Sequence, residues 1–189
     1  MVALNSTTLL GKCPKEKKYL DILEAYTKKD DLCDSFLQGF YYLFYRNRDF
    51  PTAFNIFREL AFKGNATAQN DLGNMYYNGY GVSKDYAEAF KWYRLSAAQG
   101  NAHGQANLGV MYRNGLGVVK DDAEAFKWYK LSAAQGNAQG QNNLGFMYQN
   151  GYGVSQDYAE ALKWFRSSAA QGYALAKQNL EALAKRGIQ

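Results

Sequence analysis

The chain has 189 residues, 47% of them hydrophobic and 21% charged, which is enough apolar material for a folded core and excludes a disordered protein. No apolar run reaches the roughly 18 residues that a membrane-spanning helix needs. The first residues lack the apolar stretch of a signal peptide, so we expect a cytoplasmic protein, or a periplasmic one if a leader has been removed. The net charge is +5, but six of the 22 basic residues precede residue 30, and we interpret the excess as solubilising charge.

The N-terminal segment, residues 1–33, does not share the pattern of the rest of the chain. Within it, residues 15–28 place apolar side chains at mixed spacings of three and four, which predicts an amphipathic helix that caps one end of the fold. The two cysteines, Cys13 and Cys33, also lie in this segment. Neither belongs to a C-x-x-C pair or has a histidine close in sequence, which argues against metal binding and against a reactive thiol.

From residue 34 onwards the sequence repeats itself every 36 residues without a gap, as Trp92, Trp128 and Trp164 illustrate. Between residues 68–103 and 104–139, 26 of 36 positions are identical. We assign a degenerate repeat to 34–67, full repeats to 68–103, 104–139 and 140–175, and a C-terminal capping helix to 176–187. Such repeats bury their apolar faces by stacking on their neighbours, so the chain is predicted to form one elongated stack.

Each full repeat is predicted to contain two helices joined by a glycine turn. In the first full repeat the opening helix covers residues 67–78, with Leu72 and Met75 on its apolar stripe. Gly79 and Gly81 then supply the positive φ angles of a helix end and a tight turn. Asp85 caps the second helix, and Glu88 three residues later completes the sequence of a capping box.

The second helix is predicted to bury small and aromatic side chains together. Ala89, Tyr93, Ser96 and Ala97 are expected to face inward, and Trp92 is expected to fill the gap between repeats as part of the core. The alternative is a ladder of tryptophans on which nucleic-acid bases stack. Because a core aromatic also recurs once per repeat, the packing interpretation is preferred.

Three patterns resemble catalytic or cofactor motifs and are interpreted as structural. The loop at residues 79–84 lacks the third glycine or the G-K-[ST] ending of a phosphate-binding loop. The acidic pair Asp85 and Glu88 recurs every 36 residues, which helix capping explains better than acid–base catalysis. The single histidine, His103, lies at a helix start where the sister repeats have Gln139 and Leu175. The sequence therefore predicts no catalytic residue, no cofactor site and no metal site.

The repeats carry a specific consensus, A-Q-x-x-L-G-x-M-Y-x-N-G-x-G-V-x-x-D-x-A-E-A-x-K-W-Y-x-x-S-A-A-Q-G-N-A, at 68–102, 104–138 and 140–174. It closely resembles the Sel-one-like repeat, a relative of the tetratricopeptide repeat, over roughly residues 34–187. The resemblance implies an all-α fold, a right-handed α/α superhelical solenoid of helix-turn-helix repeats. It also implies adaptor or scaffold work, often in bacteria, or neutralisation of a toxin as an immunity protein. No repeat here contains the cysteines of the disulfide-stapled branch.

The differences between the full repeats collect on one face of the first helix. Taking Leu72 as the inward direction and about 100° per residue, positions 70, 74 and 77 point away from the core, and the resemblance implies that first helices line the concave surface. The three copies place there Asn70, Asn74 and Tyr77, then Ala106, Val110 and Arg113, then Asn142, Phe146 and Gln149. All of these except Ala106 are predicted partner-binding residues, because aromatic residues and arginine are enriched in protein interfaces.

These observations lead to three functional hypotheses. The first is a non-catalytic adaptor that holds another protein on its concave face. The second is an immunity protein that blocks a bacterial toxin by direct binding. The third is an RNA-binding helical repeat, which the positive net charge allows but the mixed polar, aliphatic and aromatic face does not favour.

Overall fold

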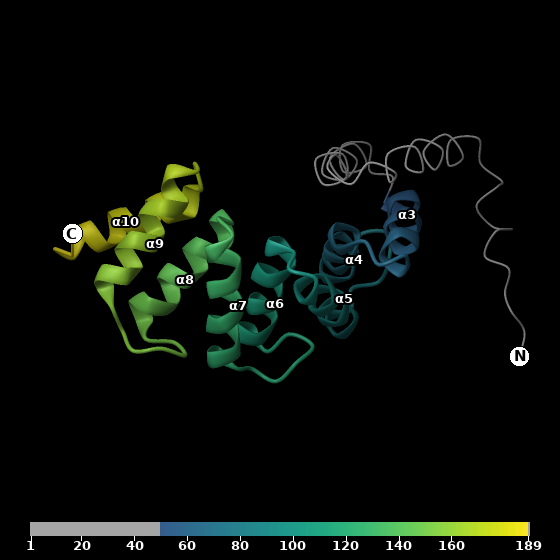
Figure 1. The fold of residues 1–189 in the computed structure, drawn as a ribbon, viewed down its shortest axis with the longest axis horizontal. Helices are drawn as coiled ribbons and strands as arrows, with labels where there is room; N and C mark the ends of the chain where they lie inside the picture. The colour runs from purple at the N-terminus through teal and green to yellow at the C-terminus, as the bar shows by residue number, and fades with distance from the viewer. Residues whose placement is uncertain (1–49, 189) are drawn as a thin grey trace, which may run out of the picture.

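The computed structural model describes residues 50–188, which form eight α-helices and no strand (Figure 1). The capping helix predicted at 15–28 and the first helix of the degenerate repeat lie outside the described residues. The helices are α3 (Phe50–Phe62), α4 (Ala66–Asn78), α5 (Tyr86–Ala98), α6 (Ala102–Asn114), α7 (Asp122–Ala134), α8 (Ala138–Asn150), α9 (Tyr158–Ala170) and α10 (Ala174–Lys185).

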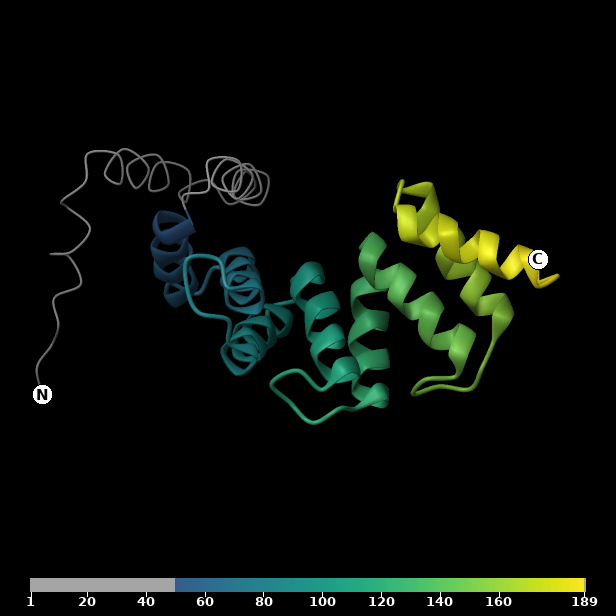
Figure 2. The ribbon, with the colours of Figure 1, turned by 180° about the vertical axis from the view of Figure 1, so that it is seen from behind.

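Successive helices pack side by side in an arc from α3 to α10 along the long axis of the molecule (Figures 1 and 2). The pairs α4/α5, α6/α7 and α8/α9 are the three full repeats, and α10 forms the predicted C-terminal helix. The first helices also contact one another, α4 with α6 and α6 with α8, whereas the second helices barely touch. The first helices therefore line the concave side, and the all-α solenoid with a 36-residue period is confirmed.

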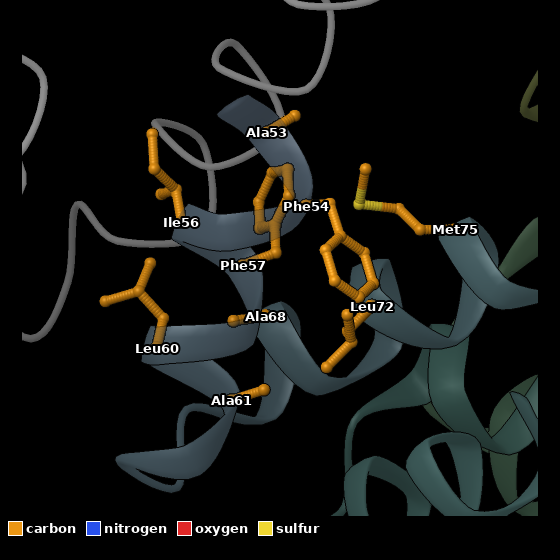
Figure 3. Close-up of a cluster of buried hydrophobic side chains, with 9 residues drawn as sticks. All are labelled: Ala53, Phe54, Ile56, Phe57, Leu60, Ala61, Ala68, Leu72 and Met75. Carbon is orange, nitrogen blue, oxygen red and sulfur yellow. The ribbon is translucent and has the colours of Figure 1, made fainter. Parts of the chain in front are cut away.

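Four clusters of buried side chains form a core that runs through the stack. The first cluster joins α3 to α4, with Phe57 of α3 and Leu72 of α4 both fully buried (Figure 3). Later clusters repeat the pattern with Leu108 and then Leu144 at the place of Leu72. Full burial of each such side chain stabilises the fold by about 1.5–3 kcal/mol, and the clusters that span neighbouring repeats make this stabilisation depend on stacking.

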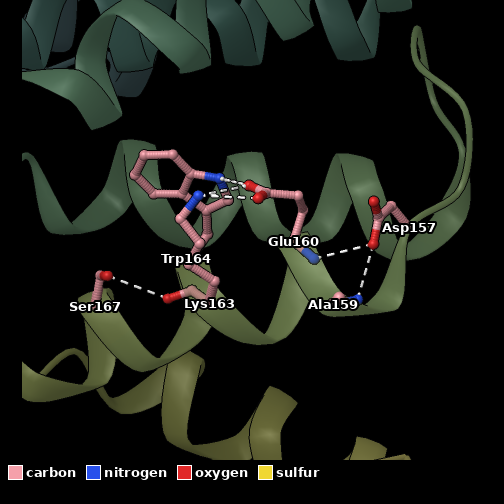
Figure 4. A network of polar contacts seen from close by, with 6 residues as sticks. All are labelled: Asp157, Ala159, Glu160, Lys163, Trp164 and Ser167. Atoms are coloured by element: carbon pink, nitrogen blue, oxygen red, sulfur yellow. Dashed lines mark hydrogen bonds and ion pairs between the residues drawn. The ribbon is translucent and has the colours of Figure 1, made fainter.

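The second helices bury the tyrosine that was predicted to face inward, or its phenylalanine equivalent, more deeply than the tryptophan beside it. Tyr129 is 2% exposed and Phe165 is fully buried, whereas Trp128 and Trp164 are only half-buried beside the clusters. The Trp164 indole Nε1 donates to Glu160 Oε2 at 3.0 Å (Figure 4). The tryptophans were expected to fill the gap between repeats as part of the core. Each does pack against a core cluster that joins neighbouring repeats, but at its border and only half-buried.

The glycine loops adopt the turn that the sequence predicted. Gly79 and Gly81 have φ angles of 78° and 70°, which L side chains rarely adopt. Gly81 also meets the preceding repeat, because a Cβ atom there would lie 2.4 Å from the carbonyl oxygen of Phe50. Gly117 makes the same approach to Tyr86, at 2.3 Å. Each loop thus rests on the start of the second helix of the repeat before it.

The second helices begin at the predicted aspartates but without a full capping box. The Asp85 carboxylate accepts from the backbone N–H groups of Ala87 and Glu88 at 2.9 and 3.0 Å. The N–H of Asp85 donates instead to the carbonyl of Tyr76, at 3.0 Å. The Glu88 side chain pairs with Lys91, so of the predicted capping-box sequence only the aspartate cap is formed. Figure 4 shows the equivalent cap at Asp157.

Buried polar side chains connect the helices at fixed points. Gln69 of α4 donates from Nε2 to the carbonyl of Ala61 in α3 at 3.1 Å. Its Oε1 accepts from Gln99, just after α5, at 2.7 Å. Ser96 of α5 donates to the carbonyl of Ala66 at 2.7 Å. These bonds recur in the next repeats, so they fix the same angle between neighbouring helices throughout the stack.

Candidate binding groove on the first helices

A cleft of about 190 Å³ opens on the concave side between α4 and α6. It contains Asn74, Tyr77 and Val110, three of the predicted partner-binding residues. Four further residues complete its lining, Asn78, Tyr93, Asn107 and Gln139. Arg113 of α6 and Phe146 of α8 continue the same face. We call the surface formed by Asn74, Tyr77, Val110, Arg113 and Phe146 the first-helix groove.

Asn70, Ala106 and Asn142 lie outside the groove, because they are 6%, 0% and 2% exposed. The expectation that position 70 and its equivalents point away from the core was wrong. Asn70 accepts a hydrogen bond from Asn107 Nδ2 at 2.9 Å, and Asn142 accepts one from Asn179 at 2.9 Å. A first helix inside a solenoid packs on its own second helix and on the first helices beside it, so two of its sides are buried.

The next position, 74 and its equivalents, forms the floor of the groove. Asn74 Oδ1 accepts from the Tyr93 hydroxyl at 2.8 Å and from Asn107 Nδ2 at 3.3 Å. Val110 packs against the third core cluster, and Phe146 packs against the fourth. The expectation that Val110 and Phe146 have nothing to bury against was therefore wrong, since both are half-buried and present only one side to the groove.

Position 77 and its equivalents form the edge of the groove nearest the loops. The Tyr77 ring meets Tyr86 edge-on, with 5.3 Å between ring centroids. The Arg113 guanidinium carbon lies over the Phe146 ring, 4.5 Å from its centroid. Gln149 is half-buried, and its Oε1 is buried without a hydrogen-bond partner among the described residues. Among the three residues of this edge only Arg113 is charged, because Tyr77 and Gln149 are neutral.

The groove has little charge of its own. The acidic and basic residues of α4, α6 and α8 are Asp71, His103 and Arg113, and Asp71 is only 8% exposed. Burial raises the pKa of the Tyr129 phenol, and the positive charge of Arg113 nearby opposes part of this rise. The exposed lysines lie mainly on the second helices, where Lys91, Lys127 and Lys163 each pair with a glutamate one turn earlier.

Residues 50–188 contain no group of three metal-binding side chains close enough to share an ion. In the same range, no helix combines the length and the apolar character that crossing a membrane requires.

The fold and the groove together define a repeat protein of the α/α solenoid class, with a half-buried concave surface and regular helix pairs. The family model of the Sel1 repeat matches residues 66–101, 102–137 and 138–173. The chain therefore belongs to the Sel1 repeat family, whose members generally act as non-catalytic scaffolds that mediate protein–protein interaction. The predicted family is confirmed, with each repeat starting two residues earlier than we assigned it.

Solved structures agree with this assignment. A protective antigen of uropathogenic Escherichia coli strains with this repeat fold is 38% identical, with a TM-score of 0.65 over 73% of this chain and 30% of that one. A Sel1 repeat protein from Oxalobacter formigenes is 34% identical, with a TM-score of 0.70 over 76% of this chain and 59% of that one. A Sel1 repeat protein from Klebsiella pneumoniae subsp. pneumoniae shares the fold at 18% identity, with a TM-score of 0.51 over 90% and 92%.

The chain thus spans 30% and 59% of the first two relatives. No curated protein matches it.

Proposed function

We propose that this protein is a non-catalytic adaptor that binds a partner protein in the first-helix groove. The observation that supports this most is that nearly identical repeats differ on the groove floor and edge. Asn74, Val110 and Phe146 occupy one repeat position, and Tyr77 and Arg113 share another. Leu72 and Met75 recur unchanged in the core of every full repeat, so variation at half-buried positions beside an open cleft supports recognition of a partner.

The chemistry of the groove suits a protein better than RNA. Tyr77, Val110 and Phe146 offer apolar contact, and the cleft beside them is lined by neutral amides. RNA recognition needs aromatic platforms and basic residues along the backbone track. The three tryptophans pack beside core clusters, and Arg113 is the one Lys or Arg residue on α4, α6 and α8. A toxin-neutralising role is a narrower form of this proposal and would use the same groove.

Variants that exchange residues between sister repeats test the proposal without disturbing the core. Val110→Asn introduces the residue that the preceding repeat has at Asn74, so the helix packing already accommodates it. Leu131→Ser is the matched control, because Leu131 is 50% exposed on a second helix and the following repeat has Ser167 there. Aspartate at Val110 or Phe146 is unsuitable, since a charge there would meet a buried cluster.

The experiment compares proteins captured from nuclease-treated extract of the source cell by the parent chain and by each variant. A groove partner should be retained by the parent and by Leu131→Ser, and its affinity for Val110→Asn should fall by about 1–2 kcal/mol. Far-UV circular dichroism and melting temperature should be unchanged. A partner that Val110→Asn retains and Leu131→Ser loses would place the binding site on the second helices.

A further inference from the structure

Arg113 is held in a fixed place at the edge of the groove. Its guanidinium carbon lies 4.5 Å from the centroid of the Phe146 ring and 5.5 Å from that of Tyr152. The two rings come from α8 and from the loop that follows it, so they orient the arginine from the next repeat. Contacts of this kind stabilise a cation and restrict its rotamers.

The positive charge of Arg113 has no acidic partner. Every ion pair among residues 50–188 joins a lysine to an aspartate or glutamate, and none includes Arg113. Its Nε is buried without an acceptor, while neither terminal nitrogen is buried in this way. The guanidinium thus rests on two rings, its terminal nitrogens are not fully buried, and no carboxylate among residues 50–188 pairs with it. A planar guanidinium held in this way is suited to two parallel hydrogen bonds with a carboxylate.

The cation is specific to one place in the stack. Tyr77 and Gln149 occupy the same position in the neighbouring repeats, so the groove edge is neutral on both sides of Arg113. The one acidic residue on α4, α6 and α8, Asp71, is buried and accepts a hydrogen bond from Asn70. Asp122, at the start of α7, acts on the Tyr129 phenol together with Arg113, but its carboxylate pairs with Lys120 at 3.5 Å. An acidic group that enters the groove therefore meets one attractive charge and no exposed carboxylate on α4, α6 or α8.

The cleft lies one helical turn from Arg113, and its lining indicates what kind of molecule would carry the acidic group. Its rim combines amide side chains, which both donate and accept, with the apolar surfaces of Tyr77 and Val110. Amides of this kind suit the N–H and C=O groups of an extended main chain. At about 190 Å³ the cleft has room for one or two side chains rather than for a folded domain.

We propose that the first-helix groove binds an extended segment of the partner protein through an aspartate or glutamate side chain that pairs with Arg113. This inference rests on the proposed function. The amide-lined cleft between α4 and α6 takes the neighbouring residues of the same segment.

The probe is a library of short random peptides displayed inside a phage coat protein, so that no peptide carboxyl terminus is free. Selection on the parent chain should enrich sequences with an aspartate or glutamate at one fixed position. Arg113→Gln, which introduces the residue found at Gln149, should weaken binding of the selected peptides at least about tenfold. Arg166→Gln is the matched control, since it removes the same charge from an exposed second-helix site and should leave binding unchanged.

A charge exchange between the protein and the peptide tests the ion pair directly. Arg113→Glu should lose the selected peptides and recover binding when their acidic residue is replaced by lysine, while all variants keep the parent's circular dichroism spectrum.

Selected peptides that depend on Val110 but carry no acid, or that bind Arg113→Gln as tightly as the parent, would overturn the role of Arg113 and leave the adaptor function intact. Failure to select any peptide sensitive to Val110→Asn would overturn the binding of an extended segment, whereas the adaptor function fails only if the capture experiment finds no partner that depends on Val110.

Discussion

The Tyr93 hydroxyl donates a hydrogen bond of 2.8 Å to Asn74 Oδ1, and this bond joins the second helix of a repeat to the groove floor. In the next repeat Val110 replaces the acceptor beside Tyr129, and in the last one Phe146 accompanies Phe165, which has no hydroxyl. The groove residue thus differs in all three repeats, while the buried aromatic behind it changes only in the last, so only part of the variation in the groove reaches into the core.

Asn74→Val should destabilise the fold by about 1–3 kcal/mol, because it removes the acceptor of the Tyr93 hydroxyl. In a Tyr93→Phe background the same substitution should cost less. Urea unfolding of the four proteins in this double-mutant cycle measures the coupling, which we expect to be about 0.5–1.5 kcal/mol. Strictly additive effects would show that the hydrogen bond does not contribute to stability.

Tyr129→Ala should cost about 3–5 kcal/mol, the range for removing a large aromatic side chain from a packed core. Trp128→Ala should cost clearly less, because the indole is half-buried and its Nε1 has no partner within the described residues. Denaturant melts followed by circular dichroism compare the two variants directly. A larger loss for Trp128→Ala would mean that the tryptophan, not the tyrosine, holds neighbouring repeats together.

Gly117→Ala should be more destabilising than Gly136→Ala, although both glycines have positive φ angles, 67° and 83°. The strain of that conformation costs about 1–2 kcal/mol at either site. A Cβ at Gly117 would also lie 2.3 Å from the Tyr86 carbonyl oxygen, whereas at Gly136 nothing described lies within 4 Å. We expect this clash to add about 1–3 kcal/mol. Equal melting temperatures for the two variants would contradict the close approach.

Ser132→Ala should cost about 1 kcal/mol or more, because the buried hydroxyl donates to the carbonyl of Ala102 at 2.7 Å. Ser167→Ala is the control, since that hydroxyl bonds only within its own helix, to Lys163, at the surface. Its effect on the melting temperature should be close to zero. Similar losses for both serines would mean that the bond between helices is no stronger than one to water.

The sequence was sufficient to predict the helix pairs, the glycine turns and the stacking, because each depends on local residue choice repeated three times. It failed where burial depends on the neighbouring repeat. Asn70 and Asn142 belong to a face that is polar in sequence, yet the adjacent first helix covers them. A single-helix projection contains no information about a second packing partner.

Four residues that line the cleft, Asn78, Tyr93, Asn107 and Gln139, were not predicted from the sequence. A comparison of the repeats within one chain detects only positions that differ. It therefore cannot detect Asn78 or Met75, which are identical in every full repeat. Asn78 lines the cleft whereas Met75 is buried, so identity alone does not separate a binding residue from a core residue. The contact of Arg113 with Phe146 and Tyr152 was equally hidden, because these residues lie 33 and 39 positions apart in the sequence.

Each loop glycine approaches the start of the second helix in the preceding repeat, and this contact allows further repeats to be added to the stack. A Cβ atom at Gly117 would lie 2.3 Å from the carbonyl oxygen of Tyr86, and one at Gly153 would lie 2.2 Å from that of Asp122, although the facing residues differ. The junction depends on backbone atoms alone and is indifferent to the side chains. Duplication of one 36-residue unit in frame would therefore add one junction of the existing kind, and a longer binding surface would arise in a single genetic step.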